Sequence, residues 1–268
     1  MLFRSGPDGR GVVKAHADRV VKEIVDAGGE AIANTDSVSE RDSAEGIVAA
    51  ALDAWGQVDI LINNAGVANV SLFSEISEND IHRVIDAHVM GNLWMCRAVW
   101  PHMTEAGYGR ILNITSYAAL GLKYNVVYGA AKGALLALGR GLAVEGAAHG
   151  IKANILGPAA GTIAATHFIE PSDWLQRQTE MLKPELVAPV AAFLVHESVP
   201  CSGKYIESAG GRIVERFFSE TEGVTSAEPT LESVRDSFEA ITDRSKATDL
   251  PDPQDDDLPL VPKPYVPA

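Results

Sequence analysis

The sequence predicts an α/β domain in which a parallel sheet is covered by helices. Short apolar runs alternate with amphipathic stretches of 12 or more residues, which is typical of βαβ units. Each apolar run ends in Gly, Ser or Asn, so polar groups are expected at the carboxyl edge of the sheet, where open α/β sheets bind ligands. The 268 residues, of which 46% are hydrophobic and 22% charged, suffice for one such domain.

The expected elements follow from the spacing of apolar residues and from the Gly and Pro residues that end each run. The first expected helix carries apolar residues at positions 20, 21, 24 and 25 and stops at Gly28-Gly29. The other expected helices cover residues 43–55, 78–103, 128–149, 174–181 and 185–196. The expected strands cover residues 31–34, 58–62, 110–114, 152–156 and 204–207, and the strand at 58–62 is expected to be buried. The order of these elements predicts a helix-flanked parallel sheet.

The last fifty residues differ in composition from the rest of the chain. Residues 219–268 hold 12 acidic and 4 basic residues and carry −8 of the net charge of −14. We expect an amphipathic helix over residues 230–242, packed on the core or on a neighbouring subunit. Residues 249–268 are acidic and rich in Pro, and we expect an extended or disordered tail. The predicted units are therefore a main domain at 1–218, a helical extension at 219–248 and a tail at 249–268.

Charge and cysteine content exclude several classes of protein. A net charge of −14 disfavours nucleic acid and anionic membranes as partners. No run of about 18 apolar residues is present, so no membrane-spanning helix is expected. The two cysteines, Cys96 and Cys201, are far apart in the sequence. They argue against a disulfide scaffold and against a thiolate metal site, and they fit a reducing compartment.

A tyrosine and a lysine, Tyr128 and Lys132, lie four residues apart on one face of an expected helix. A nearby cation stabilises tyrosinate, so the pKa of the phenol falls and it can exchange a proton with an alcohol or a carbonyl. Ser116 follows the strand at 110–114, 12 residues before Tyr128. Its hydroxyl can bond a reacting oxygen, although Ser at a strand end is also a common cap.

Two loops after expected strands can border a ligand. The run Asn63-Asn64-Ala65-Gly66 follows the strand at 58–62. Its amides can bridge neighbouring strands and its Gly lets a cofactor approach the backbone, or the run is a simple turn. Gly157-Pro158, followed by Gly161-Thr162, supplies a second loop that can cover a flat ligand.

These motifs resemble the short-chain dehydrogenase/reductase family between residues 18 and 212. The matching stretches are DILINNAG, GRILNITS, YGAAK and KANILGPAAGT. The stretches ADRVVKEIVDAGGEAIANTDSV, RAVWPHM, LKPELVAPVAAFLVHES and GGRIVERFF resemble one branch in particular. That branch contains the (3R)-hydroxyacyl-CoA dehydrogenase part of peroxisomal multifunctional enzyme type 2 and its bacterial relatives. The resemblance implies a Rossmann-like doubly wound fold with three α/β/α layers.

The resemblance also implies roles for individual residues. Tyr128 would be the general acid/base, Ser116 would position the substrate oxygen, and Lys132 would lower the pKa of Tyr128 and hold the nicotinamide ribose. His88 stands where many members have Asn; it either passes protons between Lys132 and solvent or is a helix histidine bonded to backbone. Cofactor contacts are implied for Asp36, Val38, Asn63, Ala65, Gly66, Tyr128, Lys132, Pro158, Gly161 and Thr162. No metal is expected.

Three features depart from the family pattern. The spacing from Ser116 to Tyr128 is one residue shorter than is common, so Thr115 is a possible substitute hydroxyl. Residues 163–165 read Ile-Ala-Ala where relatives have Arg-Met-Thr. No strand precedes the glycines at 6–11, so the first strand, the Gly-rich phosphate turn, the first helix and the second strand of the family are missing. We therefore expect a truncated N-terminus, a gap in the sheet, poor stability and aggregation.

Two functions from different classes follow. The first is an enzyme that transfers a hydride between NAD and a secondary alcohol or ketone, with a 3-hydroxyacyl thioester as the implied substrate. NADP is not excluded, because the strand that selects the cofactor is missing, and an NADP-dependent 3-oxoacyl reductase is a related interpretation. The second is a non-catalytic fragment or an interaction subunit that cannot bind nucleotide.

Assembly and location are expectations of the same kind. Small residues along the helix at 128–149 allow close packing, and in the family this helix forms a subunit interface, so a homodimer or homotetramer is expected. The chain ends in Tyr-Val-Pro-Ala and not in Ser-Lys-Leu, so a cytoplasmic location is expected.

Overall fold

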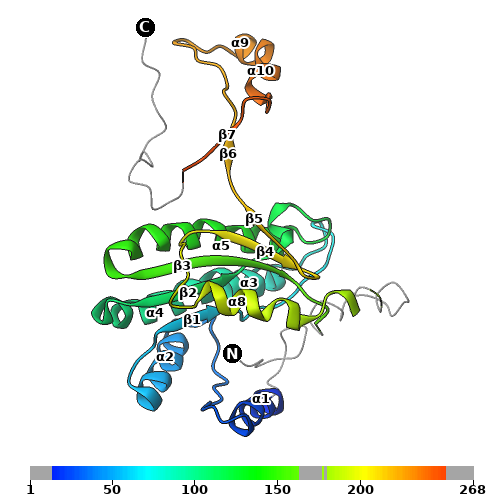
Figure 1. The fold of residues 1–268 in the computed structure, drawn as a ribbon. Coiled ribbons are helices and arrows are strands. Elements are labelled where there is room, and N and C mark those ends of the chain that lie inside the picture. The colour runs from blue at the N-terminus through cyan, green and yellow to red at the C-terminus, as the bar shows by residue number, and fades with distance from the viewer. Residues whose placement is uncertain (1–13, 163–176, 178–179, 252–268) are drawn as a thin grey trace.

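The computed structural model of the chain describes residues 14–162, 177 and 180–251. A five-stranded sheet forms its centre, with the strands in the order of the chain (Figure 1). The strands are β1 (Ile60–Asn63), β2 (Gly109–Ile114), β3 (Ile151–Ala159), β4 (Tyr205–Ala209) and β5 (Arg212–Arg216). The first four are parallel and β5 is antiparallel to β4, so the predicted helix-flanked parallel sheet is confirmed.

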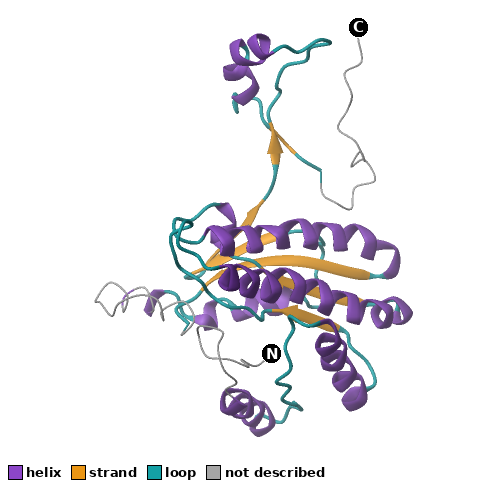
Figure 2. Cartoon of the chain, turned by 180° about the vertical axis from the view of Figure 1, so that it is seen from behind, coloured by secondary structure: helices purple, strands orange, loops and turns teal. Residues whose placement is uncertain are grey.

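Helices cover both faces of this sheet (Figures 1 and 2). One face carries α2 (Arg41–Trp55), α3 (Glu78–Ile85), the π-helical turn η1 (Asp86–Met90), α4 (Gly91–Ala106) and α5 (Val126–Gly146). The other face carries α8 (Ala188–Leu194), preceded by the turn η4 (Pro184–Leu186). Successive residues of β2 enter the two cores: Ile111 packs with α2 and α4, and Leu112 packs with Leu194 of α8. The predicted three layers are present.

The helices begin and end close to the predicted residues. The helix expected at 128–149 begins at Val126 and ends in the 3₁₀ turn η3 (Ala147–His149). Gly56 ends α2 in the left-handed conformation, with φ at 75°, which glycine adopts without strain. The helix expected at 78–103 is interrupted by η1. Most of the helix expected at 174–181 lies outside the described residues.

The predicted strand at residues 31–34 is wrong. Residues 29–37 have no regular secondary structure, and they lead from α1 (Lys14–Asp26) to α2. A β-strand needs a neighbour for its backbone N–H and C=O groups, and among the described residues no strand pairs with this segment or with the outer edge of β1. The strand β1, which was expected to be buried, is buried on one face only: Ile60 and Ile62 are 47% and 37% exposed on the other face.

The C-terminal extension differs from the single helix expected at 230–242. Two short helices, α9 (Leu231–Asp236) and α10 (Phe238–Thr242), meet at Ser237, because Asp and Ser favour turns over helix interiors. They lie between the two strands of a small antiparallel ladder, β6 (Ser219–Glu220) and β7 (Thr248–Asp249), which extends away from the sheet (Figure 1). Leu231 and Phe238 are 75% and 60% exposed, so this helical part does not pack on the core as one of our two alternatives required.

Two further expectations concern the tail and membranes. Most of the predicted tail at 249–268 lies outside the described residues, which end at Pro251. None of the helices in the described part of the chain has the length and apolar character needed to cross a bilayer.

Candidate active site

The site lies where β2 ends and α5 begins. All six residues of β2 are buried, and the Thr115 N–H donates to the Leu156 carbonyl at 2.8 Å, which continues the pairing with β3. Ser116 then begins the 3₁₀ turn η2 (Tyr117–Leu120), and its Oγ accepts a hydrogen bond from the Ala118 N–H at 3.2 Å. Ser116 is therefore a cap, as the alternative interpretation required, and its O–H remains able to donate to another group.

Thr115 is unsuitable as the substitute hydroxyl that the short spacing suggested. It is 2% exposed, and its Oγ1 donates to the Lys132 carbonyl at 2.7 Å. This bond ties the end of β2 to α5 and uses the single proton of the hydroxyl. The expectation about Thr115 is wrong because its side chain faces the core and Ser116, the next residue, faces the site.

Lys132 is a buried lysine one turn into α5 from Tyr128. Its side chain is 4% exposed, and Nζ donates to the Ile114 carbonyl at 2.7 Å. Nζ also lies 5.6 Å from the centroid of the Tyr128 ring. Burial lowers the pKa of Lys132 to about 7, because a charged ammonium loses its hydration there. An ammonium has three donors, and Ile114 takes one of them.

Tyr128 is half-buried, and its pKa differs in direction from our expectation. Burial raises the pKa of Tyr128, and a hydrogen bond with the Ser116 side chain offsets this in part. Lys132 does not reverse the shift, because its ammonium bonds Ile114 and is itself destabilised by burial. The phenol therefore holds its proton near neutral pH and can act as a general acid toward a carbonyl oxygen.

His88 lies in the π-helical turn η1 beside Tyr128. The two rings meet edge to face, with centroids 5.2 Å apart and planes at 83°. His88 is 2% exposed, and its Nε2 lies 2.7 Å from the Val67 carbonyl and 3.1 Å from the Val67 N–H. Burial lowers the pKa of His88 to about 3, so the imidazole is neutral near pH 7. This geometry favours the histidine bonded to backbone over the proton carrier.

The loop after β1 is held against His88. A Cβ atom on Gly66 would overlap the His88 ring, with Nδ1 at 2.9 Å and Cε1 closer still. Gly66 is therefore needed for the close approach of the His88 side chain, and the approach of a cofactor to its backbone stays a prediction. Among the described residues His88 Nδ1 has no hydrogen-bond partner.

The expected bridge between strands by an amide side chain is present. Asn63 at the end of β1 donates from Nδ2 to Asn113 Oδ1 on β2 at 3.0 Å, and both side chains are buried. The same Nδ2 lies 3.2 Å from Cys96 Sγ. Burial raises the pKa of Cys96 to about 12, so this thiol is an unreactive part of the core.

The other predicted cofactor residues lie at the carboxyl edge or before α2. Pro158 of β3 pairs with Ser208 of β4, and the Gly161 N–H donates to the Leu182 carbonyl at 2.7 Å. Asp36 is exposed, whereas the Val38 side chain packs in the core against Gly91. Ala65 and Thr162 are in the loops that follow β1 and β3. Residues 163–165, where the chain departs from its relatives, lie outside the described residues.

One group beside Ser116 was missed in the sequence. Tyr117, which follows Ser116, lies under the Arg216 guanidinium, with 5.5 Å from Cζ to the ring centroid. Arg216 in turn makes two hydrogen bonds to Glu207 of β4, at 2.6 and 2.9 Å. The sequence shows the two charged residues, Arg216 in VERF and Glu207 in IES, but it does not show that they meet. They meet because β5 folds back on β4, and β5 was not predicted.

The described residues fit one half of a dinucleotide. Lys132 offers two further buried N–H donors, which suit the hydroxyls of a ribose, and Tyr128 lies beside it. A Gly-rich turn at the start of a helix, which would bind the pyrophosphate, is not among residues 14–162 and 180–251. In the same part of the chain no cluster of His, Cys, Asp and Glu could hold a metal ion.

A parallel sheet with a Ser, a Tyr and a Lys near its carboxyl edge agrees with the resemblance to the short-chain dehydrogenase/reductase family. The family model described as short chain dehydrogenase matches residues 11–172. The chain belongs to the short-chain dehydrogenase/reductase family and is an oxidoreductase of that type, and the family binds NAD or NADP.

Two curated proteins and one solved structure are similar to this chain. Mouse peroxisomal multifunctional enzyme type 2 is 38% identical over 91% of this chain and 33% of its own length. A putative short-chain type dehydrogenase/reductase of Mycobacterium tuberculosis, Rv0148, is 37% identical over 90% of this chain and 83% of its own length. The solved structure of full-length peroxisomal multifunctional enzyme type 2 from Drosophila melanogaster superposes with a TM-score of 0.72 at 34% identity, covering 88% of this chain and 41% of that one. The chain thus spans about a third of the mouse enzyme.

Proposed function

We propose that this oxidoreductase transfers a hydride between NAD(H) and a secondary alcohol or ketone, with a 3-hydroxyacyl or 3-oxoacyl thioester as substrate. The observation that carries the proposal is the placement of three groups: Ser116 follows β2 and lowers the pKa of Tyr128 through its side chain, and Lys132 Nζ lies 5.6 Å from the centroid of the Tyr128 ring. The thioester class follows from the sequence stretches shared with the branch that contains the multifunctional enzymes. NADP remains the alternative cofactor.

The residues divide the work of a ketone reduction as follows. NAD(H), when bound, supplies the hydride to the carbonyl carbon. Tyr128 donates its phenolic proton to the carbonyl oxygen, and its raised pKa keeps that proton in place until then. Ser116 donates a hydrogen bond to the same oxygen and fixes its position. In the reverse direction Tyr128 takes the proton from the alcohol.

Lys132 would hold the cofactor ribose with the donors that Ile114 leaves, and residues along the sheet edge would border the rest of the cofactor. Asn63, Ala65, Pro158, Gly161 and Thr162 lie in the loops after β1 and β3 and would approach the nicotinamide half. Asp36 and the backbone of Val38 would contact the adenine. Gly66 contributes by letting His88 reach Val67, and His88 is proposed as a positioning residue for that loop.

The unit at 1–218 is proposed as the catalytic domain, with 219–248 as its extension and 249–268 as a tail. A homodimer or homotetramer through α5 is supported by the small residues on that helix. The free state of both cysteines supports a reducing compartment, and we propose the cytoplasm.

The test is Tyr128→Phe, with Tyr124→Phe as the matched control. Tyr124 is a 42% exposed tyrosine just before α5. We expect wild type and Tyr124→Phe to reduce acetoacetyl-CoA with NADH, whereas Tyr128→Phe binds NADH with unchanged affinity and loses turnover by about 100-fold or more. Retained turnover in Tyr128→Phe would remove Tyr128 from its role, and faster turnover with NADPH would replace NAD by NADP.

A further inference from the structure

A partly buried ion pair between two strands lies near the turn that begins at Ser116, and its Arg216 side chain is 33% exposed. Glu207 of β4 is 9% exposed, and Arg216 of β5 binds both of its carboxylate oxygens, at 2.6 and 2.9 Å. A planar guanidinium that binds a carboxylate through two parallel bonds is fixed in orientation as well as in position. We call these two residues the β4–β5 clamp.

The clamp reaches the turn that holds Ser116. The Arg216 guanidinium lies 5.5 Å from the centroid of the Tyr117 ring. Tyr117 is 52% exposed, so the core holds this ring only in part. Tyr117 is the first residue of η2, whose N-cap is Ser116. A cation over an aromatic face is attractive, so the clamp holds the first residue of this turn from outside the sheet.

Tyr205 lies on the same face of β4 and β5 as Glu207 and Arg216. It is 6% exposed and pairs with Arg216 across the two strands. A Cβ atom on Gly157 would lie 2.9 Å from the Tyr205 hydroxyl, so the glycine in β3 makes room for this ring. Burial and the Glu207 carboxylate raise the pKa of Tyr205, which keeps the phenol neutral. A neutral Tyr205 adds no second negative charge beside Glu207, so Arg216 is the charged partner of this carboxylate.

We propose that Glu207 and Arg216 are positioning residues for the Ser116 hydroxyl. They hold the Tyr117 ring, and through this ring they keep the turn η2 in its folded conformation, which fixes the position of Ser116 relative to Tyr128. The proposal rests on the proposed role of Ser116. The sequence of contacts runs from Glu207 to Arg216, to the Tyr117 ring, and to the cap hydrogen bond between Ser116 Oγ and the Ala118 N–H.

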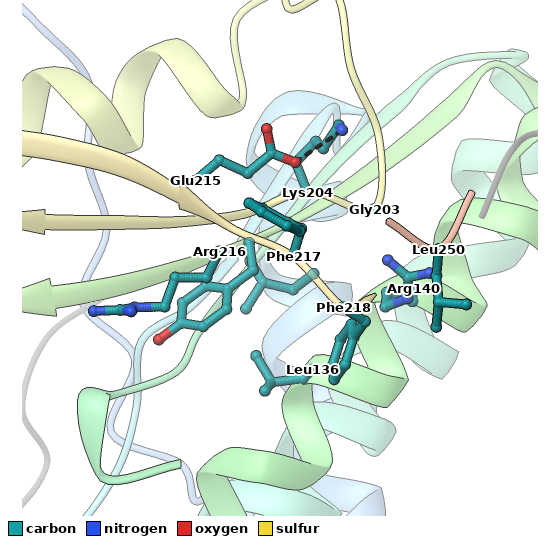
Figure 3. Close-up of a pocket in the computed structure, with 11 residues that line it drawn as sticks. Leu136, Arg140, Gly203, Lys204, Glu215, Arg216, Phe217, Phe218 and Leu250 are labelled. Carbon is teal, nitrogen blue, oxygen red and sulfur yellow. Dashed lines mark hydrogen bonds and ion pairs between the residues drawn. The ribbon is translucent and has the colours of Figure 1, made fainter. Parts of the chain in front are cut away.

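A second ion pair, between Lys204 just before β4 and Glu215 of β5, provides the matched control. Lys204 and Glu215 are 2.8 Å apart, with side chains 24% and 40% exposed. Figure 3 shows these two side chains together, with the Arg216 side chain extending away from them. Glu215 and Arg216 are neighbours in β5 and point to opposite faces, so Lys204→Gln removes an ion pair on the face away from Arg216.

The experiment measures hydrogen–deuterium exchange of the segment 116–121 in the full chain, which needs no substrate. In Arg216→Gln and in Glu207→Gln we expect this segment to exchange about two- to fivefold faster, the factor that one exposed cation–π contact supplies. Arg216→Lys should give a smaller rise, because it keeps the charge without the planar fork. Exchange of β2 should stay as in wild type, and Lys204→Gln should leave both segments unchanged.

A second background isolates the Tyr117 ring. In Tyr117→Ala the added substitution Arg216→Gln should have no further effect on exchange at 116–121. An equal rise in that background, an unchanged rate in Arg216→Gln, or the same rise in Lys204→Gln would each overturn the proposal. If Arg216→Gln does not fold, Arg216→Lys and Glu207→Gln decide by the same criteria.

Turnover separates this proposal from the proposed function. With acetoacetyl-CoA and NADH, Arg216→Gln should lower kcat by about the same factor as its effect on exchange, while KM stays within about twofold. A wild-type chain without turnover would count against the proposed function alone, because the exchange result still decides whether the clamp holds η2.

Discussion

Gly66→Ala should destabilise the protein through one side chain, His88. A Cβ atom at position 66 would overlap the imidazole ring, which is 2% exposed and cannot turn into solvent. The backbone at Gly66 is outside the left-handed region, so the alanine causes no backbone strain there. The whole cost therefore comes from moving the ring.

Four contributions set the size of this cost. Displacing the ring loses its hydrogen bond with Val67, about 1 kcal/mol. It forces overpacking of about 1–3 kcal/mol and disturbs the edge-to-face contact with Tyr128. The reduced entropy of the unfolded chain returns about 0.5–1 kcal/mol. We expect the free energy of unfolding to fall by about 2–3 kcal/mol.

Urea denaturation followed by tryptophan fluorescence measures this change, and two comparisons assign it to His88. Gly133→Ala in α5 is the control, because a Cβ there meets no atom within 4 Å, and it should stabilise by about 0.5–1 kcal/mol. In His88→Ala the cost of Gly66→Ala should nearly vanish. A cost that persists in His88→Ala, or one below about 0.5 kcal/mol in wild type, would refute the reasoning.

Three further predictions concern titratable and hydroxyl groups of the site. Burial lowers the pKa of Lys132 from 10.5 to about 7, so between these pH values the unfolded chain binds more protons than the folded chain. The free energy of unfolding should therefore rise with pH in this range, by up to about 1.4 kcal/mol per pH unit. Urea denaturation of the wild type and of Lys132→Met measures this difference. Burial lowers the pKa of His88 from 6.5 to about 3, so the free energy of unfolding should drop as the pH falls below about 6.5. Between pH 7 and 4.5 His88→Asn should lose less stability than the wild type, and equal losses would contradict the assignment. Thr115→Val should cost about 1 kcal/mol and spare turnover, whereas Ser116→Ala should lower kcat by about 100-fold, and the reverse pattern would exchange their roles.

The parts of the fold that were predicted correctly depend on local sequence. β2, β3 and α5 carry continuous apolar runs or helical spacing, and each ends at a Gly or a polar residue. The strand at 31–34 has a similar local pattern but finds no partner among the described residues. β5 was not predicted, because a five-residue strand with three charged residues and no alternation of apolar and polar residues resembles a loop until β4 lies beside it.

The candidate site shows the same division. The spacing of Tyr128 and Lys132 and the place of Ser116 at a strand end could be found in the sequence. The direction of the pKa shift of Tyr128 could not, because it depends on how deeply α5 packs against β2. The contact of Arg216 with Tyr117 joins residues about a hundred positions apart, and only the antiparallel turn between β4 and β5 creates it.

The strand β1 is hydrogen-bonded along one edge only, and this should decide where the site opens first. β1 holds hydrogen bonds to β2 on one side only within the described part of the chain, and its four residues lead directly into the loop that carries Asn63 and Gly66. Local opening should therefore start at this edge at a lower free energy than on the side of β3 and β4. Each opening would detach Asn63 from Asn113 and Val67 from His88 together, so the cofactor side of the site should loosen as one cooperative unit while Ser116 and Tyr128 stay in place.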